Sequence, residues 1–181
     1  MSETRLKIRI IGDKVLRRTA KQVKDVLPEH REILSNMAKL MYESSGIGLA
    51  APQVGISESM IVVDAGTGLY KLINPKIVKR QGSQAIEEGC LSVPGVSIKV
   101  KRSKKILISA LDENAQPLCI EADDLLSCVF QHEIDHLKGK LIVDYASFLD
   151  KFKIKKKLKK LEKGKDGGLR QPKEKPGELQ L

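Results

Sequence analysis

The sequence predicts an α+β fold in which mostly antiparallel sheets wrap around one buried helix. Short apolar segments with turn residues between them fill the middle of the chain, as in a sheet. The segment 123–137 is apolar over much of its helical surface, which is typical of a helix in the interior. Segments 29–42 and 148–163 also have helical periodicity, and they predict an N-terminal and a C-terminal helix.

The N-terminal part begins with an apolar segment, 7–11, whose loose alternation predicts a short strand. His30 stands at the start of the helix predicted at 29–42 and is expected to be a solvated surface residue. The apolar side chains of this helix fall on one face, and they are Ile33, Leu34, Met37, Leu40 and Met41. The segment 46–55 that follows is too apolar for a solvent loop and too rich in glycine and proline for a helix.

The central sheet is predicted from short apolar segments separated by glycine, proline, asparagine and aspartate residues. These segments are 60–63, 69–73, 76–79, 96–100, 105–111 and 117–120. Their connections are short, which favours antiparallel meanders because parallel crossovers need longer connections.

The C-terminal part follows the buried helix, which Gly139 closes, and residues 141–143 could add a last strand. Residues 1–163 are expected to form a single catalytic domain, of which 148–163 is a basic helix. Residues 164–181 are rich in glycine, proline, lysine and glutamate, which predicts a mobile polar tail.

The formal net charge of +10 is concentrated near the C-terminus. Residues 151–181 carry 12 of the 33 basic residues and four of the 23 acidic ones. Such a tail can meet anionic partners without setting the chemistry of the nearly neutral domain. No segment resembles a signal peptide or a membrane span, so a cytoplasmic protein without membrane association is expected. Three cysteines at irregular spacing argue against a disulfide framework.

The clearest chemical motif is His132-Glu133-Ile134-Asp135-His136, which is H-E-x-x-H within the predicted buried helix. Histidines four residues apart project from the same helical face and can share one metal ion. Glu133 is offset by one residue, which suits it to take a proton from a metal-bound water. A helix that carries these residues by chance is the alternative, but unpaired histidine and glutamate are costly among apolar residues. The motif therefore predicts a metal-dependent hydrolase.

A catalytic metal site typically has three protein ligands, so one ligand remains to be found. Downstream of His136, the only acids before the basic segment 151–181 are Asp144 and Asp150, without the extended motif of some zinc proteases. Upstream, Cys90 lies between a glycine and a turn, where a thiolate can reach a metal. Taken alone, Cys90 and Cys119 are each more typical of a small buried hydrophobe.

Three segments occur in a defined order along the chain: Gly46-Ile47-Gly48-Leu49-Ala50-Ala51-Pro52-Gln53, Glu88-Gly89-Cys90-Leu91-Ser92 and Gln131-His132-Glu133-Ile134-Asp135-His136-Leu137. Together they resemble the three motifs of peptide deformylase, in the bacterial type whose C-terminal segment is a helix. Their order and separation match as well, and the resemblance covers about residues 6–163. Each motif alone is moderately specific, whereas all three in order are very specific.

The resemblance implies a hydrolase that removes the formyl group from the N-terminal formyl-methionine of nascent polypeptides, releasing formate. It implies that Cys90, His132 and His136 hold one divalent metal ion, natively Fe²⁺, with Zn²⁺, Ni²⁺ or Co²⁺ as substitutes. It further implies that Gln53 and the backbone N–H of Leu91 bind the developing oxyanion. Glu133 would deprotonate the attacking water and later protonate the leaving amine.

The resemblance also implies how the peptide binds. The substrate would lie as an added strand, with main-chain contacts from Ile47, Gly48 and Gly89. Cys128, four residues before His132, is expected on the metal-facing side of the helix. The methionine side chain would enter an apolar pocket formed by Ile86, Leu125, Cys128 and Val129.

The basic helix at 148–163 has three interpretations. The first is a solvated helix packed by the narrow apolar stripe of Ile154, Leu158 and Leu161. The second is a membrane-surface helix, for which the apolar face is narrow. The third, which the resemblance favours, is docking on the ribosome, since a lysine-rich face suits rRNA phosphates. A monomer is expected.

Two rival functions remain at this point. An H-E-x-x-H metallopeptidase needs a third ligand downstream and has no role for Cys90. A basic ribosome-binding or RNA-binding protein with a structural metal needs a fourth ligand, and no spare Cys or His suits that position.

Overall fold

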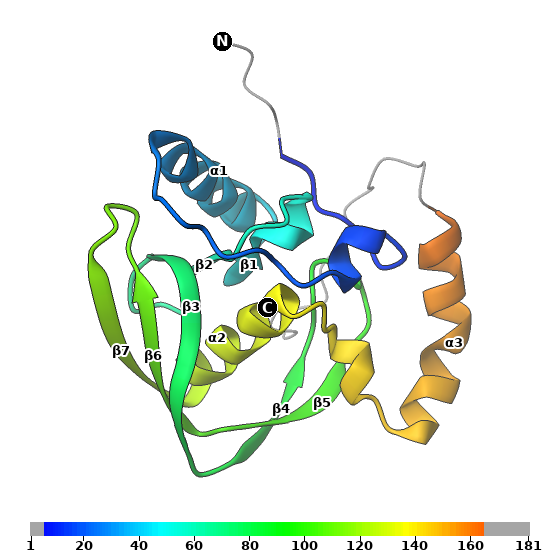
Figure 1. The fold of residues 1–181 in the computed structure, drawn as a ribbon. Helices are drawn as coiled ribbons and strands as arrows, with labels where there is room; N and C mark the ends of the chain where they lie inside the picture. Colours follow the sequence, from blue (N-terminus) through cyan, green and yellow to red (C-terminus); the bar gives the residue numbers. More distant parts are fainter. Residues whose placement is uncertain (1–5, 165–181) are drawn as a thin grey trace.

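The computed structural model describes residues 6–164, whose arrangement is shown in Figure 1. The strands are β1 (Gly48–Ala50), β2 (Met60–Val63), β3 (Tyr70–Gln81), β4 (Gln84–Glu88), β5 (Ile98–Arg102), β6 (Lys105–Leu111) and β7 (Pro117–Asp123). The α-helices are α1 (Pro28–Glu43), α2 (Asp124–Leu137) and α3 (Phe148–Lys163). Three short 3-10 helices are η1 (Lys14–Arg17), η2 (Ala51–Val54) and η3 (Ile142–Tyr145).

All strand pairs are antiparallel, and they form two sheets. The main sheet has five strands in the order β1-β2-β3-β6-β7, and the smaller sheet pairs β4 with β5. Helix α2 lies in the middle of the molecule, with the main sheet on one side and β4 and β5 on another (Figure 1). This arrangement confirms the predicted α+β fold with sheets wrapped around one buried helix.

The core around α2 is aliphatic apart from a few aromatic rings. Val129, Phe130 and Ile134 of α2 are buried in one cluster with Ile61 and Ile108 of the main sheet. Full burial of a side chain of this size contributes about 1.5–3 kcal/mol, so these contacts fix the helix against the sheet. The position of the chemical motif therefore follows from the packing of the helix that carries it.

The two outer helices are held differently. Helix α1 packs through buried Leu34, Met37 and Met41. Helix α3 has no buried residue, and only its stripe of Ile154, Leu158 and Leu161 packs against a second cluster that includes Val96 and Ile98. Figure 1 shows α3 at the edge of the molecule, which agrees with this one-sided contact.

Several predicted strands differ from the structure. Segment 7–11 is not a strand, although Arg9 N–H and Ile11 N–H donate single hydrogen bonds to Gln53 and Ser92 carbonyls. The expected last strand at 141–143 is the 3-10 helix η3. Segments 69–73 and 76–79 belong to the one long strand β3, and β4 was not predicted at all.

The prediction that His30 is a solvated surface residue is wrong. The side chain is only 4% exposed, and its Nδ1 accepts a hydrogen bond of 2.8 Å from the Leu27 backbone N–H. Its Nε2 lies 3.5 Å from a carboxylate oxygen of Glu58. His30 therefore holds the start of α1 against the neighbouring loop, a tertiary contact that the local sequence does not reveal.

Within residues 6–164, none of the helices is long and apolar enough to cross a membrane. The predicted mobile tail at 164–181 lies outside the described residues from position 165 onward.

Candidate metal centre

Two metal-ligand candidates lie on one face of α2. The helical spacing brings the Nε2 atoms of His132 and His136 to 3.1 Å from each other, with the rings nearly perpendicular at 75°. Both side chains are buried, at 2% and 1% exposure. The geometry that the H-E-x-x-H motif predicts for two imidazoles sharing a metal is therefore present.

The third candidate comes from the chain that follows β4. Cys90 is buried, and its Sγ lies 3.4 Å from Nε2 of His136. The candidate donor atoms of Cys90, His132 and His136 all lie within 4.8 Å of one another. The structure thus joins a residue of the H-E-x-x-H helix to a residue some forty positions earlier.

The donor set fits a divalent transition metal. One sulfur and two imidazole nitrogens are ligands that Fe²⁺ and Zn²⁺ accept, and three protein ligands leave a position open. Burial raises the pKa of the Cys90 thiol to about 12, and the nearby Glu133 carboxyl adds to the effect. Burial also lowers the pKa of His136, which favours the neutral imidazole that a metal needs. A buried thiolate would be costly without a cation beside it, so this cluster suits a metal.

Glu133 lies beside these donors without joining them. Both carboxylate oxygens are buried and have no hydrogen-bond partner among residues 6–164. Burial, and then the negative charge of Glu88, raises the pKa of Glu133 well above its usual value. A Cβ at Gly48 would collide with this carboxylate, so only glycine leaves room there. An unpartnered carboxyl with a raised pKa is suited to exchange a proton with a bound reactant.

Gln53 approaches the same place from η2. Its Oε1 accepts a hydrogen bond of 2.7 Å from the Ala50 N–H, which turns Nε2 toward Cys90. Nε2 lies 3.8 Å from Cys90 Sγ and 3.3 Å from the Ser92 hydroxyl oxygen. Gln53 is fully buried, so its amide N–H groups are held in place and shielded from water.

The residues expected to contact the substrate differ in how deeply they are buried. Ile47 and Ile86 are partly buried and pack against the cluster that contains Val129, so these three share one apolar region. Cys128 is buried and its Sγ accepts a hydrogen bond of 3.2 Å from Gln84. Leu125 is 37% exposed, which places it at the surface.

Gly89 and Leu91, which were also expected to take part, flank Cys90 in the segment that follows β4. Gly89 is buried before Cys90, and Leu91 after it is only partly buried. A Cβ at Gly46 would come within 2.9 Å of the Leu91 side chain, which shows that these two segments lie close together.

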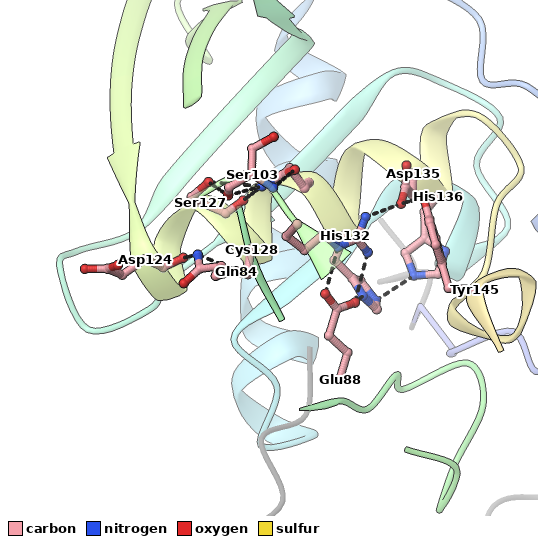
Figure 2. A network of polar contacts seen from close by, with 12 residues as sticks. Gln84, Glu88, Ser103, Asp124, Ser127, Cys128, His132, Asp135, His136 and Tyr145 are labelled. Atoms are coloured by element: carbon pink, nitrogen blue, oxygen red, sulfur yellow. Dashed lines mark hydrogen bonds and ion pairs between the residues drawn. The ribbon is translucent and has the colours of Figure 1, made fainter. Parts of the chain in front are cut away.

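Four residues that support the site were not predicted, and three of them, Glu88, Asp135 and Tyr145, are labelled in Figure 2. Glu88 Oε2 lies 3.0 Å from Nδ1 of His132, and the Arg102 guanidinium donates to both Glu88 oxygens at 2.7 and 2.9 Å. Arg102 also donates to Asp135 Oδ2 at 2.5 Å, and the Tyr145 hydroxyl donates to the same oxygen at 2.6 Å. These contacts orient the His132 ring and connect it to η3.

Glu88 and Arg102 stabilise each other's ionised form. Burial opposes ionisation of Glu88, but hydrogen bonds from Arg102 and His132 outweigh it, so the pKa of Glu88 is lowered. The Arg102 guanidinium keeps its proton because Glu88 and Asp135 raise its pKa in spite of burial. Asp135 within the motif was a signal for this network, but its partners are distant in sequence and could not be inferred from it.

Comparison with known proteins identifies the family. A family model described as polypeptide deformylase matches residues 5–152. Curated peptide deformylases of Carboxydothermus hydrogenoformans and Syntrophomonas wolfei are 48% and 50% identical over 136 residues. In each case the match covers 75% of this chain and 90% of the relative.

Solved structures agree with the sequence matches. A peptide deformylase from Legionella pneumophila superposes with a TM-score of 0.82 at 38% identity, covering 87% of this chain and 95% of that one. A peptide deformylase from Synechococcus elongatus in complex with actinonin gives 0.81 at 41%, covering 87% and 90%. These matches do not favour the rival metallopeptidase or RNA-binding functions. The chain belongs to the polypeptide deformylase family, the metal-dependent hydrolases that remove the formyl group from nascent polypeptides.

Proposed function

We propose that this chain deformylates its substrates at a single metal ion held by Cys90, His132 and His136. The observation that carries this assignment is the convergence of the three donor atoms within 4.8 Å, beside the unpartnered Glu133 carboxylate. When bound, a divalent metal lowers the pKa of a coordinated water toward about 7 and polarises the formyl carbonyl.

Glu133 is the proposed proton carrier. Its carboxylate takes a proton from the attacking water and then gives that proton to the amine nitrogen as the C–N bond breaks. Its raised pKa supports this double role, because a group that both accepts and donates works best with a pKa near the working pH. Neither oxygen has a hydrogen-bond partner among residues 6–164, which leaves both available to the reactants.

Gln53 Nε2 and the backbone N–H of Leu91 are the proposed donors to the formyl oxygen as negative charge develops on it. Each such donor is worth about 10²–10³ in rate in other acyl-transfer enzymes. The Ala50 contact to Gln53 supports this role, because it fixes the direction of the amide before substrate binds.

The peptide is proposed to run beside Ile47, Gly48 and Gly89 as an added strand, contacted through the main chain. Ile86, Val129, Cys128 and Leu125 would contact the methionine side chain. The shared cluster of Ile47, Ile86 and Val129 supports an apolar pocket, and the exposed Leu125 suits its rim.

Fe²⁺ is the proposed native metal, with Zn²⁺, Ni²⁺ or Co²⁺ able to replace it, because the mixed sulfur and nitrogen donors suit all four. The test is formate release from a formyl-methionyl peptide by protein purified without oxygen, with metal analysis of the same sample. Cys90→Ala should lose both metal and activity. The matched control Cys119→Ala changes an exposed thiol and should keep both. Full metal content in Cys90→Ala would rule out the proposed ligand set.

We further propose that the chain works as a cytoplasmic monomer that docks on the ribosome through α3. Lys155, Lys156 and Lys159 are exposed on this helix and could meet rRNA phosphates. Changing these three to Gln should weaken cosedimentation with ribosomes and reduce its salt dependence. Lys24, Lys39 and Lys76, which are exposed elsewhere, provide a control with the same loss of charge. Equal ribosome binding by both triple variants would contradict docking through α3.

A further inference from the structure

A basic hollow lies outside the set of proposed metal ligands. It has a volume of about 310 Å³, at the small end of the range for ligand pockets. β3, the turn after it, β5 and the end of α2 all contribute to its wall. The cationic side chains that line it are Arg80, Lys101, Arg102, Lys138 and Lys140.

Most of these charges have no counter-charge. Arg80, Lys101, Lys138 and Lys140 form no ion pair with any residue in the described part of the chain. The one acid in the lining is Asp135, whose Oδ2 already accepts hydrogen bonds from Arg102 and from Tyr145, the latter also at the hollow (Figure 2). The hollow therefore carries a strong positive field that the protein itself does not neutralise.

The Arg80 guanidinium is held in position by the protein before any ligand binds. Arg80 Nη1 donates to Gln131 Oε1 at 2.8 Å, and Gln131 is itself anchored by bonds from its amide to the Ser103 and Ser127 carbonyls. Arg80 Nε and Nη2 have no acceptor among residues 6–164. A guanidinium held at one edge can present its other N–H groups to an anion with little further loss of entropy.

The end of α2 does not cancel this field. A helix C-terminus carries partial negative charge, which would repel an anion. Its last carbonyls are partly satisfied, because Lys138 N–H and Lys140 N–H donate to Asp135 O and Gly139 N–H donates to His136 O. Four full positive charges outweigh the partial charge that remains, roughly half an elementary charge.

We propose that this hollow binds a phosphate dianion, either free phosphate or the phosphate of a small monoester. Phosphate matches the planar fork of Arg80 and the ammonium groups of the three lysines, and the Ser83 and Ser103 hydroxyls at the lining can add hydrogen bonds. A single phosphate group also fits the small volume, whereas a groove for a nucleic-acid strand would extend further along the surface. None of the proposed metal ligands lines this hollow.

The test is a titration of the full-length, zinc-loaded, ¹⁵N-labelled protein with inorganic phosphate, followed by amide chemical shifts. Saturable shifts are expected at Gly82, Ser83, Ser103 and Lys140, which line the hollow. Adenosine monophosphate serves as a second probe: tighter binding than free phosphate identifies a monoester ligand, and equal or weaker binding identifies free phosphate. Shifts centred on the lysines of α3, or no saturable shifts, would overturn the proposal.

Matched variants distinguish specific phosphate binding in the hollow from non-specific attraction to a positively charged protein. Changing Lys101, Lys138 and Lys140 together to Gln should weaken phosphate binding about tenfold, since each exposed charge contributes a modest share. The control, in which Lys24, Lys39 and Lys76 are changed to Gln, loses the same charge and should bind within about twofold of the parent. Equal weakening in both variants would show non-specific attraction and refute the site. Binding of a ten-nucleotide RNA at these amides without any response to phosphate or adenosine monophosphate would also refute it.

Discussion

At the scale of single residues, Glu133 combines two properties that rarely persist together. It is an acid with 0% exposure, and neither of its oxygens has a partner among the described residues. Burying such a group costs several kcal/mol unless its environment later supplies a partner or a proton. Its position beside Gly48 and the metal-ligand candidates supports the proposal that the reactants are its missing partners.

Glu133→Gln tests this role directly. The amide has nearly the same shape, so the site should keep its metal, but it cannot accept a proton at neutral pH. Loss of a general base lowers rates by about 10²–10⁴, and we expect a fall in kcat of that size. Formate release measured beside metal content checks the prediction, and a variant with more than a tenth of the parent activity would contradict it.

Gly48→Ala tests the close contact between Gly48 and the Glu133 carboxylate. The added Cβ would collide with the Glu133 carboxylate, so either the strand or the acid must move. We expect metal content to stay unchanged while activity falls at least about tenfold, because displacing a reacting group by about 1 Å can cost 10²-fold. Gly164→Ala, where the added Cβ has more room, provides the control and should retain full activity.

Ionisation of the Glu88 carboxylate makes the stability of the folded protein depend on pH. Its pKa is lowered in the folded protein, so the carboxylate stabilises the fold above its unfolded pKa of about 4.5. That contribution is lost as the pH falls through the lower, folded pKa. Breaking a buried ion pair costs about 3–5 kcal/mol. Glu88→Gln should therefore lower the unfolding free energy most near pH 7, and the difference should shrink toward pH 3.

Denaturant unfolding of the parent and Glu88→Gln across that range measures the difference. Lys39→Gln, an exposed position on α1, controls for general charge effects and should follow the parent. A difference between parent and Glu88→Gln that stays constant from pH 7 to pH 3 would show that folding does not lower the pKa of Glu88.

At the scale of elements, local patterns were reliable where they were long and periodic. The helix predicted at 148–163 has the bounds of α3, whose Ser147 side chain caps Asp150 N–H. Strand β6 was also predicted with its observed bounds. Strand β4 was not, because Gln84-Ala85-Ile86-Glu87-Glu88 lacks the apolar and polar alternation of a strand and its pairing with β5 is a tertiary contact.

The predicted break within β3 was wrong for a specific reason. Asn74-Pro75 has the composition of a turn, yet the strand continues through a register shift between Ile73 and Lys76. Proline is tolerated at such an irregularity because no ladder hydrogen bond is required of it. Asn74 adopts a φ of 53° and its side chain bonds both backbone groups of Val23, which compensates for the irregular backbone.

Within the site, too, local patterns predicted some residues and distant contacts determined others. His132, Glu133 and His136 follow from one helical motif, whereas the position of Cys90 made it only a candidate ligand and the resemblance assigned it. The Arg102 contacts to Glu88 and Asp135 join residues 14 and 33 positions apart, so neither periodicity nor spacing could reveal them. Supporting residues of this kind become visible only when the fold is known.

Tyr145 extends this network from η3 to the metal-ligand candidate. Its hydroxyl fixes Asp135, which helps to hold Arg102 and thereby Glu88 and His132. Mutating groups that orient a ligand typically lowers metal affinity 10–100-fold. Tyr145→Phe acts three hydrogen-bonded contacts further away, so we expect a smaller loss than for Glu88→Gln, measured by competition with a zinc chelator. An equal loss in both variants would mean that the effect does not pass through this chain of contacts.

At the scale of the whole molecule, stability is distributed unevenly. Helix α2 is enclosed by both sheets, and its side chains complete the main apolar cluster. Helix α3 contributes only partly buried Ile154, Leu158 and Leu161 to the second cluster, and Phe148 and Phe152 at its start are 85% and 76% exposed. Local opening free energy follows buried apolar contact, so α3 should open long before the core does.

Native-state hydrogen exchange measures this order. The amides of α3 should exchange with a low local free energy, while those of α2 should approach the global unfolding free energy. Leu158→Ala should speed exchange in α3 with little change in α2, whereas Phe130→Ala should cost about 3–5 kcal/mol globally because it leaves a cavity in the core. Activity of Leu158→Ala on a short formyl-methionyl peptide should match the parent, because none of the proposed metal ligands, oxyanion donors or substrate contacts lies on α3. Equal protection in α2 and α3 would instead mean that the outer helix and the catalytic core unfold as one cooperative unit.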